Sequence, residues 1–458
     1  MSRHSLRIIV SAWLMPALAA AAPDAERGAV KLVILDPGHF HAALMQKSMY
    51  PQVDPVVHVY APEGVDLTEH LKRIEGYNTR AEKPTAWEQV VHVGPGFREE
   101  MFKDRPGNVL VLAGNNRSKA EHIKNGVDAG YHVLADKPMV IDKAGFELLR
   151  QAFDAARKKN VLLYDIMTER YEITSALQRE FSLQPEVFGE LEKGTPENPA
   201  VTKESVHHFF KYVSGSALKR PAWYFDVAQQ GEGIVDVTTH LVDLVQWGCF
   251  PGESIDYEKD IEVLSAKHWP TAVTTKEFND VTKLDAVPEF LRKDVQGDVI
   301  NVYANGEINF RIRGICAKVS VTWNYRAPEG AGDTHFSIMR GTRSNLIIRQ
   351  GSEQGYKPVL FIEPASGTDP DALAQALVPA LGRIEAKYPG VELRKLDNSW
   401  QVVVPARYDV GHEAHFAKVM ENYLGYIAAG ELPDWEVPNM LAKYYTTTQA
   451  LELARKGR

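Results

Sequence analysis

Residues 129–138 read AGYHVLADKP, and in this stretch a lysine follows directly after a short apolar run. Val133 and Leu134 predict a buried strand, and Pro138 ends regular pairing because it has no N–H group to donate. A lysine at the carboxyl end of a strand in an α/β sheet lies in the crevice where ligands bind. Lys137 can there hold a hydroxyl or carbonyl oxygen and stabilise its developing negative charge, while an ordinary surface lysine before a turn is the alternative.

Residues 233–243, GIVDVTTHLVD, carry an acid and a histidine four positions apart. This spacing predicts that Asp236 and His240 lie on one face of a helix. A base and an orienting carboxylate are what a hydride-transfer site adds to a lysine. The two stretches together favour Lys137, Asp236 and His240 as a catalytic group, and Asp243 on the same predicted helix is a candidate for binding the substrate.

Nearer the amino terminus, residues 31–44 read KLVILDPGHFHAAL, which is a short apolar strand, a glycine turn and a helix that opens with small residues. This is the layout of a dinucleotide-binding unit. Of the usual G-x-G-x-x-G pattern only Gly38 remains, and it is followed by His39, Phe40 and His41. We expect these four residues to contact the cofactor.

Two further predicted strands end in residues that suit such a cofactor. Glu63 follows a strand at 56–60, where an acid meets the adenosine ribose, although a solvated loop acid is the alternative. An acid there would repel a 2′-phosphate, so Glu63 favours NAD slightly over NADP. Asn115 and Asn116 follow a strand at 108–112 and suit the nicotinamide ribose, although a plain turn is the alternative.

The substrate side of the site has three aromatic or histidine candidates. Trp223 lies in an aromatic cluster that suits stacking on a sugar ring, but such clusters more often fill a core. His207 and His208 either reach the pocket or are satisfied structural residues. No Cys/His spacing suggests a metal site, so no metal is expected.

Strands and helices alternate from residue 31 to residue 164, which predicts a mostly parallel sheet. Later predicted strands, from 299 to 339, alternate apolar and polar residues as antiparallel strands with one covered face do. A strand, a helix and two short strands are predicted within 355–410, and helices within 411–458. The broad antiparallel sheet offers a surface for homo-oligomer formation.

The first 22 residues have the layout of a secretory signal peptide. Arg3 and Arg7 precede the apolar run 8–20, and alanines at 19–22 suit cleavage, which predicts a periplasmic or secreted protein. A start codon placed too far upstream is the alternative. No other segment is apolar for long enough to span a bilayer, so no membrane is expected as a partner. The net charge of −8, without a long basic run, argues against nucleic acid.

The chain resembles the Gfo/Idh/MocA family, which includes glucose–fructose oxidoreductase and inositol dehydrogenase, over residues 31 to about 350 and in the last helices. Residues 129–138 look like its A-G-x-H-V-L-x-E-K-P motif, with Asp136 in place of Glu. Residues 233–240 look like its G-x-x-x-D-x-x-x-H motif. The string LDPGHFHAAL and the extra carboxyl-terminal region are similar to a secreted bacterial branch associated with carbohydrate breakdown.

The resemblance implies an α/β protein with a Rossmann-type parallel sheet at 23–164, followed by an α+β domain at 165–458 with a large, mostly antiparallel sheet. Residues 355–410 are then a small α/β insertion. The resemblance also implies that Asp136 and Lys137 contact the cofactor, which is NAD or NADP. A sugar hydroxyl would give its proton to His240 and its carbon would give hydride to the nicotinamide, while Lys137 holds the oxygen and Asp236 orients the site.

We therefore expect an NAD(P)-dependent oxidoreductase that acts on a hydroxyl of a sugar or glycoside. Because free dinucleotide is scarce outside the cytoplasm, a redox-neutral glycosidase or sugar–sugar oxidoreductase with tightly bound NAD(P) is a second hypothesis. A sugar- or dinucleotide-binding protein without catalytic activity is a third.

Overall fold

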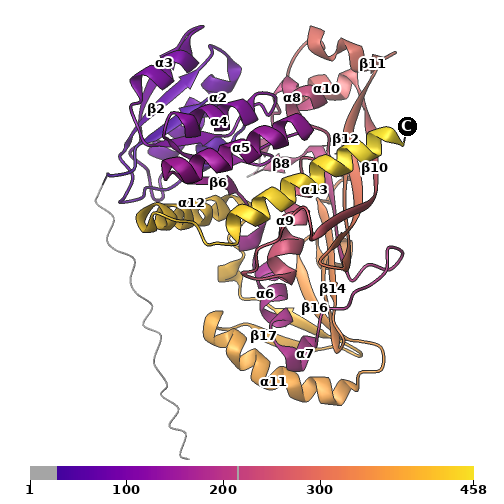
Figure 1. The fold of residues 1–458 in the computed structure, drawn as a ribbon. Helices are drawn as coiled ribbons and strands as arrows, with labels where there is room; N and C mark the ends of the chain where they lie inside the picture. Colours follow the sequence, from indigo (N-terminus) through magenta and orange to yellow (C-terminus); the bar gives the residue numbers. More distant parts are fainter. Residues whose placement is uncertain (1–27, 214–215, 458) are drawn as a thin grey trace, which may run out of the picture.

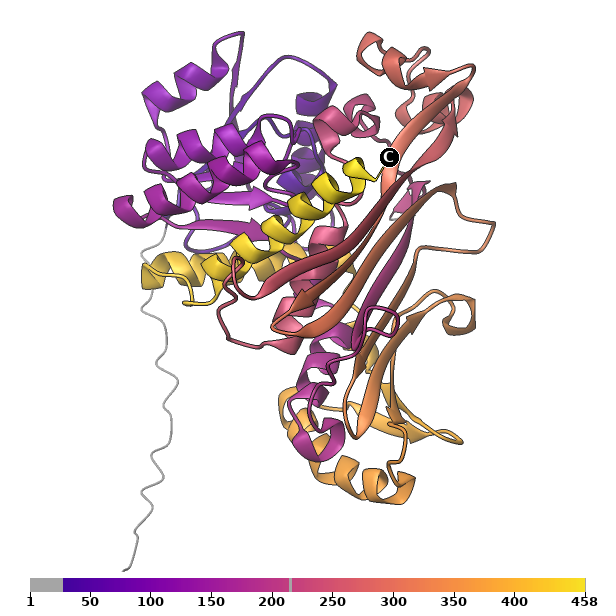
Figure 2. The same ribbon diagram turned by 45° about the vertical axis from the view of Figure 1, so that its right-hand side comes forward.

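The computed structural model describes residues 28–213 and 216–457, and the signal peptide predicted at 1–22 lies outside them. Two sheets dominate the fold. One is built by the amino-terminal part of the chain and the other by the later strands, as Figure 1 shows. The last helix, α13 (Glu436–Lys456), lies across both parts in the views of Figure 1 and Figure 2.

The first sheet contains six parallel strands in the order β3-β2-β1-β4-β5-β6. This is the strand order of a doubly wound Rossmann fold, in which ligands bind at the carboxyl ends of the strands where the order reverses. The predicted Rossmann-type sheet is confirmed. Its elements are β1 (Leu32–Leu35), α1 (His41–Leu44), β2 (Val56–Ala61), α2 (Val65–Thr79), β3 (Glu88–Val93), α3 (Phe97–Asp104), β4 (Val109–Leu112), α4 (Lys119–Asp128), β5 (His132–Asp136), α5 (Lys143–Lys159) and β6 (Leu163–Ile166).

Continuous apolar runs form the central strands of this sheet. The strand β1 reads LVIL and β4 reads VLVL, and every one of these residues is buried. Strands that are covered on both faces need such runs rather than alternation. Asp142 starts α5, since its side chain accepts a hydrogen bond from the backbone N–H of Gly145.

The second sheet contains ten strands, and the path β10-β12-β13-β7-β14-β15-β16-β18-β17 runs through nine of them, with β11 paired to β12. All pairs are antiparallel except β13 and β7, which run parallel with Ala317 opposite Val201. The predicted large, mostly antiparallel sheet is confirmed. Its strands are β7 (Val201–Phe210), β10 (Ile261–Thr274), β11 (Val295–Gln296), β12 (Val299–Ile312), β13 (Ile315–Arg326), β14 (Thr334–Arg340), β15 (Ser344–Gln350), β16 (Val359–Pro364), β17 (Glu392–Lys395) and β18 (Trp400–Val403).

Helices cover one face of the second sheet. The helices α6 (Ile173–Ser182) and α9 (Thr238–Cys249) bury Leu177, Phe181 and Leu241 in one core with sheet residues such as Phe310. Within residues 355–410, β16, β18 and β17 extend the sheet at its edge, and α11 (Pro370–Lys387) packs its apolar side into the same core. This region is therefore continuous with the second sheet.

The carboxyl-terminal helices join the two parts of the molecule. The helix α12 (His412–Ala429) packs into the core of the first sheet through Phe416, Met420 and Tyr423, and α13 contributes residues to both cores. Among residues 28–213 and 216–457, we find no helix with the length and apolar character that a bilayer crossing needs.

Candidate active site

The two sequence motifs meet at the carboxyl edge of the first sheet. The strand β5 ends at Asp136, so Lys137 projects from that edge, and its Nζ donates a hydrogen bond to Asp236 Oδ1 at 2.6 Å. Gln230 Nε2 donates to the other carboxylate oxygen at 3.0 Å. Burial raises the pKa of Asp236, but the Lys137 ammonium and the Gln230 amide outweigh burial and lower that pKa. The carboxylate is therefore charged and held from two sides.

The prediction that Asp236 lies within the helix is wrong, because α9 begins at Thr238. Asp236 lies in the preceding turn, where its backbone N–H donates to Glu232 O at 3.1 Å. The turn forms because the backbone at Gly233 passes very close to the backbone of β12. The backbone N–H of Gly233 donates to Tyr303 O at 2.9 Å, and a Cβ at Gly233 would lie 1.7 Å from Ala304 O. Only glycine fits there, and the helix starts beyond this contact.

His240 lies in the first turn of α9. Burial lowers its pKa to about 4, and the nearby Lys137 ammonium acts in the same direction. Its Nδ1 atom is buried and has no hydrogen-bond partner among the residues that the structure describes. His240 is therefore neutral near pH 7 and offers a nitrogen that can accept a proton.

A buried lysine that the sequence analysis missed supports this edge. Lys119 is the first residue of α4, and its Nζ donates to Asn116 Oδ1 at 2.5 Å, to Asp136 O at 3.1 Å and to Pro138 O at 3.3 Å. Burial lowers the pKa of Lys119 to about 8. The sequence contained a signal for this role. A cation in the first turn of a helix is unfavourable because it opposes the helix dipole, so Lys119 at this position indicates a compensating interaction elsewhere.

The asparagines predicted to bind the nicotinamide ribose join the two parts of the molecule. They contact the short helix α8 (Val227–Gln230). Asn115 Nδ2 donates to Gln229 Oε1 at 2.7 Å, and Asn116 Nδ2 donates to Gln230 O at 2.7 Å. Since Gln230 also holds Asp236, the hydrogen bonds run from Lys119 through Asn116 and Gln230 to the Lys137–Asp236 pair.

The residues of the glycine turn gather around Asp136. His39 Nδ1 lies 3.2 Å from Asp136 Oδ2, and His41 Nδ1 lies 3.0 Å from the same oxygen. Burial alone would raise the pKa of Asp136, but the two imidazoles hold it well below its ordinary value. Burial lowers the pKa of both histidines. The cluster thus contains one carboxylate and two neutral imidazoles.

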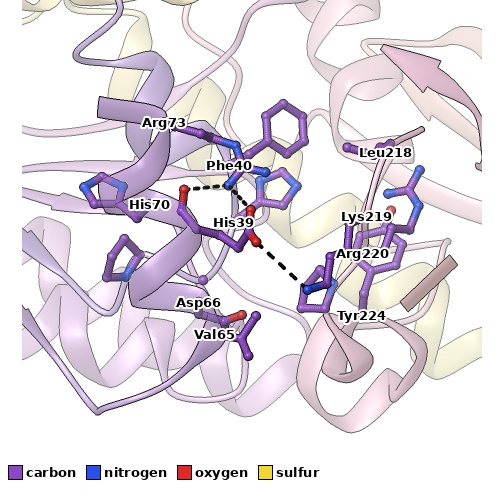
Figure 3. A pocket seen from close by; sticks show the side chains of 14 residues that line it. His39, Phe40, Val65, Asp66, His70, Arg73, Leu218, Lys219, Arg220 and Tyr224 are labelled. Atoms are coloured by element: carbon purple, nitrogen blue, oxygen red, sulfur yellow. Dashed lines mark hydrogen bonds and ion pairs between the residues drawn. The ribbon is translucent and has the colours of Figure 1, made fainter. Parts of the chain in front are cut away.

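A cleft opens beside Gly38, His39 and Phe40. Figure 3 shows His39 and Phe40 between α2, which supplies Asp66 and Arg73, and the segment 218–224. Glu63 is exposed and lines a neighbouring hollow just past β2, at the position expected for it.

Trp223 closes one end of the glycine turn. It lies on the 3-10 turn η2 (Ala222–Phe225), and its Nε1 donates to Asp66 Oδ2 at 2.9 Å. A Cβ at Gly38 would lie 2.9 Å from that oxygen and 3.2 Å from Trp223 Cζ2, so a side chain here would displace the Asp66 carboxylate from its bond with Trp223. Trp223 is buried among aromatic residues, so the structure places it in a core that borders the predicted cofactor site.

The two histidine candidates for substrate binding meet at one carboxylate. His207 stacks on Trp323, and its Nδ1 lies 3.5 Å from Asp333 Oδ2. His208 Nδ1 lies 2.8 Å from Asp333 Oδ1, and both His208 and Asp333 line a surface hollow. The prediction that Asp243 binds substrate is not supported. Its two oxygens accept hydrogen bonds from Arg170 at 2.7 Å and from Lys443 at 2.8 Å, and only 2% of the residue is exposed.

A second carboxylate near His240 also escaped the sequence analysis. Glu169 lies on the turn η1 (Glu169–Tyr171) just after β6, and His412 Nδ1 from α12 lies 3.2 Å from its Oε1. Burial would raise the pKa of Glu169, but His412, His240 and His415 lower it. No local signal could have joined residues so far apart in sequence.

The site suits a nicotinamide cofactor in several respects. The loop around Gly38 lies at the switch point between β1 and β4, where such folds bind dinucleotides. The backbone at Gly114 leaves no room for a side chain, because a Cβ there would lie 2.0 Å from Asp36 O. His240 Nδ1, which lacks a partner, lies within electrostatic range of Lys137. These residues can bind a dinucleotide and act on a hydroxyl group beside it.

Comparisons with known proteins agree with this architecture. A family model described as "Putative oxidoreductase C terminal domain" matches residues 177–455. The crystal structure of a "putative oxidoreductase" from Parabacteroides merdae ATCC 43184 is 57% identical in sequence with a TM-score of 0.93, over 95% of this chain and 99% of that chain. A search of curated proteins found no match.

More distant structures share the fold. KijD10, a 3-ketoreductase from Actinomadura kijaniata in complex with NADP and TDP-benzene, is 14% identical with a TM-score of 0.54, over 93% of this chain and 97% of that chain. Levoglucosan dehydrogenase in complex with NADH and levoglucosan is 14% identical with a TM-score of 0.57, over 93% of this chain and 98% of that chain. At this level of identity the likeness concerns the fold alone.

Proposed function

Because this chain belongs to the oxidoreductase family defined by that carboxyl-terminal domain, we propose that it is a nicotinamide-dependent oxidoreductase acting on a hydroxyl of a sugar or glycoside. Within that assignment we propose membership of the Gfo/Idh/MocA group. Two distant structural neighbours support the sugar substrate, since one is a 3-ketoreductase with NADP and the other is a levoglucosan dehydrogenase with NADH and levoglucosan.

The Lys137–Asp236 pair carries this proposal. A lysine and a carboxylate 2.6 Å apart lie at the carboxyl edge of a Rossmann sheet, within electrostatic range of a neutral histidine. A structural ion pair would not need His240 to keep an unpartnered, buried nitrogen beside it. The arrangement provides a group that can hold an oxygen, a group that can take a proton and a carboxylate that orients the lysine.

The chain offers residues for each part of the cofactor. We propose that the backbone around Gly38 to Phe40 holds the pyrophosphate, that Glu63 or Asp66 lies near the adenosine ribose, and that Asn115 and Lys137 lie near the nicotinamide ribose. The cofactor, when bound, would supply the hydride acceptor.

In the proposed reaction His240 takes the proton from the substrate hydroxyl. Lys137 holds the same oxygen through a charged hydrogen bond, which gains strength as negative charge develops on that oxygen. Asp236 keeps the ammonium in place, because it already accepts a hydrogen bond from Lys137 Nζ. Proton transfer by a positioned histidine contributes on the order of 10²- to 10⁴-fold in rate.

A second candidate function is redox-neutral chemistry with a captive cofactor, such as glycoside cleavage. The observation that favours it concerns the segment 221–231, which is hydrogen-bonded to α2 beside the glycine turn and to the turn after β4. Trp223 bonds to Asp66 on one side, and Gln229 bonds to Asn115 on the other. A dinucleotide bound beneath this segment would dissociate slowly. We also propose export, on the basis of the predicted signal peptide, and self-association through the second sheet.

The test of the proposal is to purify the protein without added nucleotide, denature it and analyse the released small molecules by mass spectrometry. Release of about one NAD or NADP per chain would support the captive cofactor, and glycoside cleavage without added NAD would then be assayed. An empty protein that binds added NAD or NADP and reduces it with a sugar would support the plain dehydrogenase. A protein that binds no dinucleotide in either test would contradict both, and binding without turnover by wild type and Lys137→Ala alike would indicate a binding protein.

A further inference from the structure

The part of the turn where this chain departs from the glycine pattern forms a compact group of ligand-type atoms. His39 Nδ1, His41 Nδ1 and a carboxylate oxygen of Asp136 all lie within 4.8 Å of one another. The oxygen is 3.2 Å from the first nitrogen and 3.0 Å from the second. Ligand atoms around a metal with bonds of about 2.0 to 2.2 Å are separated by similar distances.

We propose that His39, His41 and Asp136 bind one divalent transition-metal ion. Two imidazoles and one carboxylate form a recognised ligand set that leaves further coordination positions open. Imidazole nitrogen suits zinc, iron and similar ions, whereas magnesium and calcium prefer oxygen ligands. The chemical class of the ligand is therefore a borderline-soft divalent cation. This proposal does not depend on the proposed function.

Metal ions bind neutral imidazole and ionised carboxylate. The Nδ1 atoms of His39 and His41 already face the carboxylate of Asp136, at 3.2 Å and 3.0 Å from the same oxygen. The competing arrangement is a cluster in which both imidazoles donate hydrogen bonds to Asp136 and no ion binds.

The two nearest cations are held by other groups. Lys137 is paired with Asp236, and Lys119 donates to an amide oxygen and two carbonyl oxygens. Among residues 28–213 and 216–457, the hydrogen-bond partners of the Asp136 carboxylate are the two imidazoles, and neither ammonium bonds to it. The positive charges of these lysines oppose the binding of a metal ion, but neither ammonium occupies the position where the ion would bind.

The cluster has a rigid inner side and an open side. Asp136 is 2% exposed, and the ring of Phe416 packs against His41 with a centroid distance of 4.5 Å. On the other side, 17% of the His39 side chain is exposed and lines the cleft drawn in Figure 3. An ion can therefore enter from the cleft and meet ligands whose orientation is fixed by packing.

The molecule contains a second group of three ligand-type residues, with one imidazole and two carboxylates, that serves as a control. His92, Glu100 and Asp104 also bring three ligand-type atoms within 4.8 Å of one another, but both acids are exposed. These side chains lose more conformational freedom when they hold an ion, and water competes for them. We expect no tight site there.

The experiment uses the full chain without an affinity tag, stripped with a chelator and titrated with Zn²⁺ alone by isothermal calorimetry, with metal content measured by mass spectrometry. We expect one ion per chain. Loss of a direct ligand in His41→Ala should weaken binding by more than about 100-fold, since even outer partners of a metal ligand contribute 10- to 100-fold. Asp136→Asn, which keeps the shape of the side chain, should weaken binding strongly, and His92→Ala should leave it unchanged.

Three results would overturn the proposal. The first is that no ion binds at a stoichiometry of one, which would establish a hydrogen-bonded cluster only. The second is that His92→Ala and His41→Ala weaken binding equally, which would indicate adventitious surface binding. The third is that Asp136→Asn binds as tightly as the wild type. Circular dichroism of each variant shows that it is folded. Since the experiment measures neither turnover nor dinucleotide binding, failure here leaves the proposed function untouched.

Discussion

The ammonium of Lys119 donates to the carbonyl oxygen of Asp136 at 3.1 Å, directly before Lys137 in the chain, and to Pro138 O at 3.3 Å directly after it. The backbone of Lys137 is thus held on both sides by one buried side chain. Its side chain is held separately by Asp236 at 2.6 Å. The first motif is therefore fixed by α4, and the second motif is fixed by contact with β12.

This relationship predicts that Lys119→Met lowers kcat by about 10- to 100-fold, because a misplacement of about 1 Å at a reacting group can cost 10²-fold. Lys137 itself remains, so KM should change by less than about 3-fold. Steady-state kinetics with the sugar substrate checks both values. Lys124→Met is the matched control, since Lys124 lies on the same helix and pairs with Asp128 four residues later. An equal loss in the two variants would contradict the positioning role.

The second prediction concerns the protonation of His240. Burial and the Lys137 ammonium both lower its pKa, to about 4. A base must be neutral to act, so kcat/KM should fall only as the pH approaches about 4, well below the value near 6.5 of an ordinary histidine. His240→Asn should lower kcat by about 10²- to 10⁴-fold.

The effect of the Lys137 ammonium on the pKa of His240 can also be measured without an activity assay. If the Lys137 ammonium lowers the pKa of His240, Lys137→Met should raise that pKa, and NMR of the imidazole protons as a function of pH would detect the change. The kinetic variant His240→Asn does not test this interaction, because it removes the imidazole whose pKa would be measured. An unchanged His240 titration in Lys137→Met would show that the two groups do not interact.

The third prediction concerns stability in acid. Burial lowers the pKa of His122 on α4 to about 4, whereas an unfolded histidine titrates near 6.5. The unfolded chain therefore binds more protons between these values, so the stabilisation is complete above about pH 6.5 and is lost as the pH falls towards 4. We expect His122→Gln to make the decline of the urea midpoint between pH 6.5 and pH 4 shallower than in the wild type. Parallel pH profiles would contradict this expectation.

Much of the fold could be predicted from local patterns. Runs such as VLVL at β4 favour a strand that is buried on both faces, and the alternation of strands and helices predicts that these strands run parallel. The exact start of α9 could not be predicted, because the spacing of Asp236 and His240 suits a helix. What prevents the helix there is the contact of Gly233 with β12, about 70 residues further along the chain.

The site was predictable only where its residues lie in one motif. Lys137, Asp236 and His240 each follow from a local pattern, and the structure brings Lys137 and Asp236 into contact. Glu169 and His412 come together only when α12 packs beside β6, so no local pattern indicates them. Asp243 shows the opposite case, because its place one turn after His240 suggested the site, whereas its partners come from η1 and α13.

The last prediction concerns that buried network. Lys443 Nζ lies 2.7 Å from Asp165 Oδ2 and 2.8 Å from Asp243 Oδ1, and the lysine side chain is fully buried. Removing the ammonium leaves two buried carboxylates with less compensation, and breaking such a pair costs about 3 to 5 kcal/mol. Lys443→Met should therefore lower the free energy of unfolding, measured by urea titration, by about that amount. Lys418→Met, which removes an exposed pair with Glu421 on α12, should change it by less than about 1 kcal/mol. If both variants unfold at the same urea concentration, the network does not stabilise the junction between α9, α13 and the first sheet.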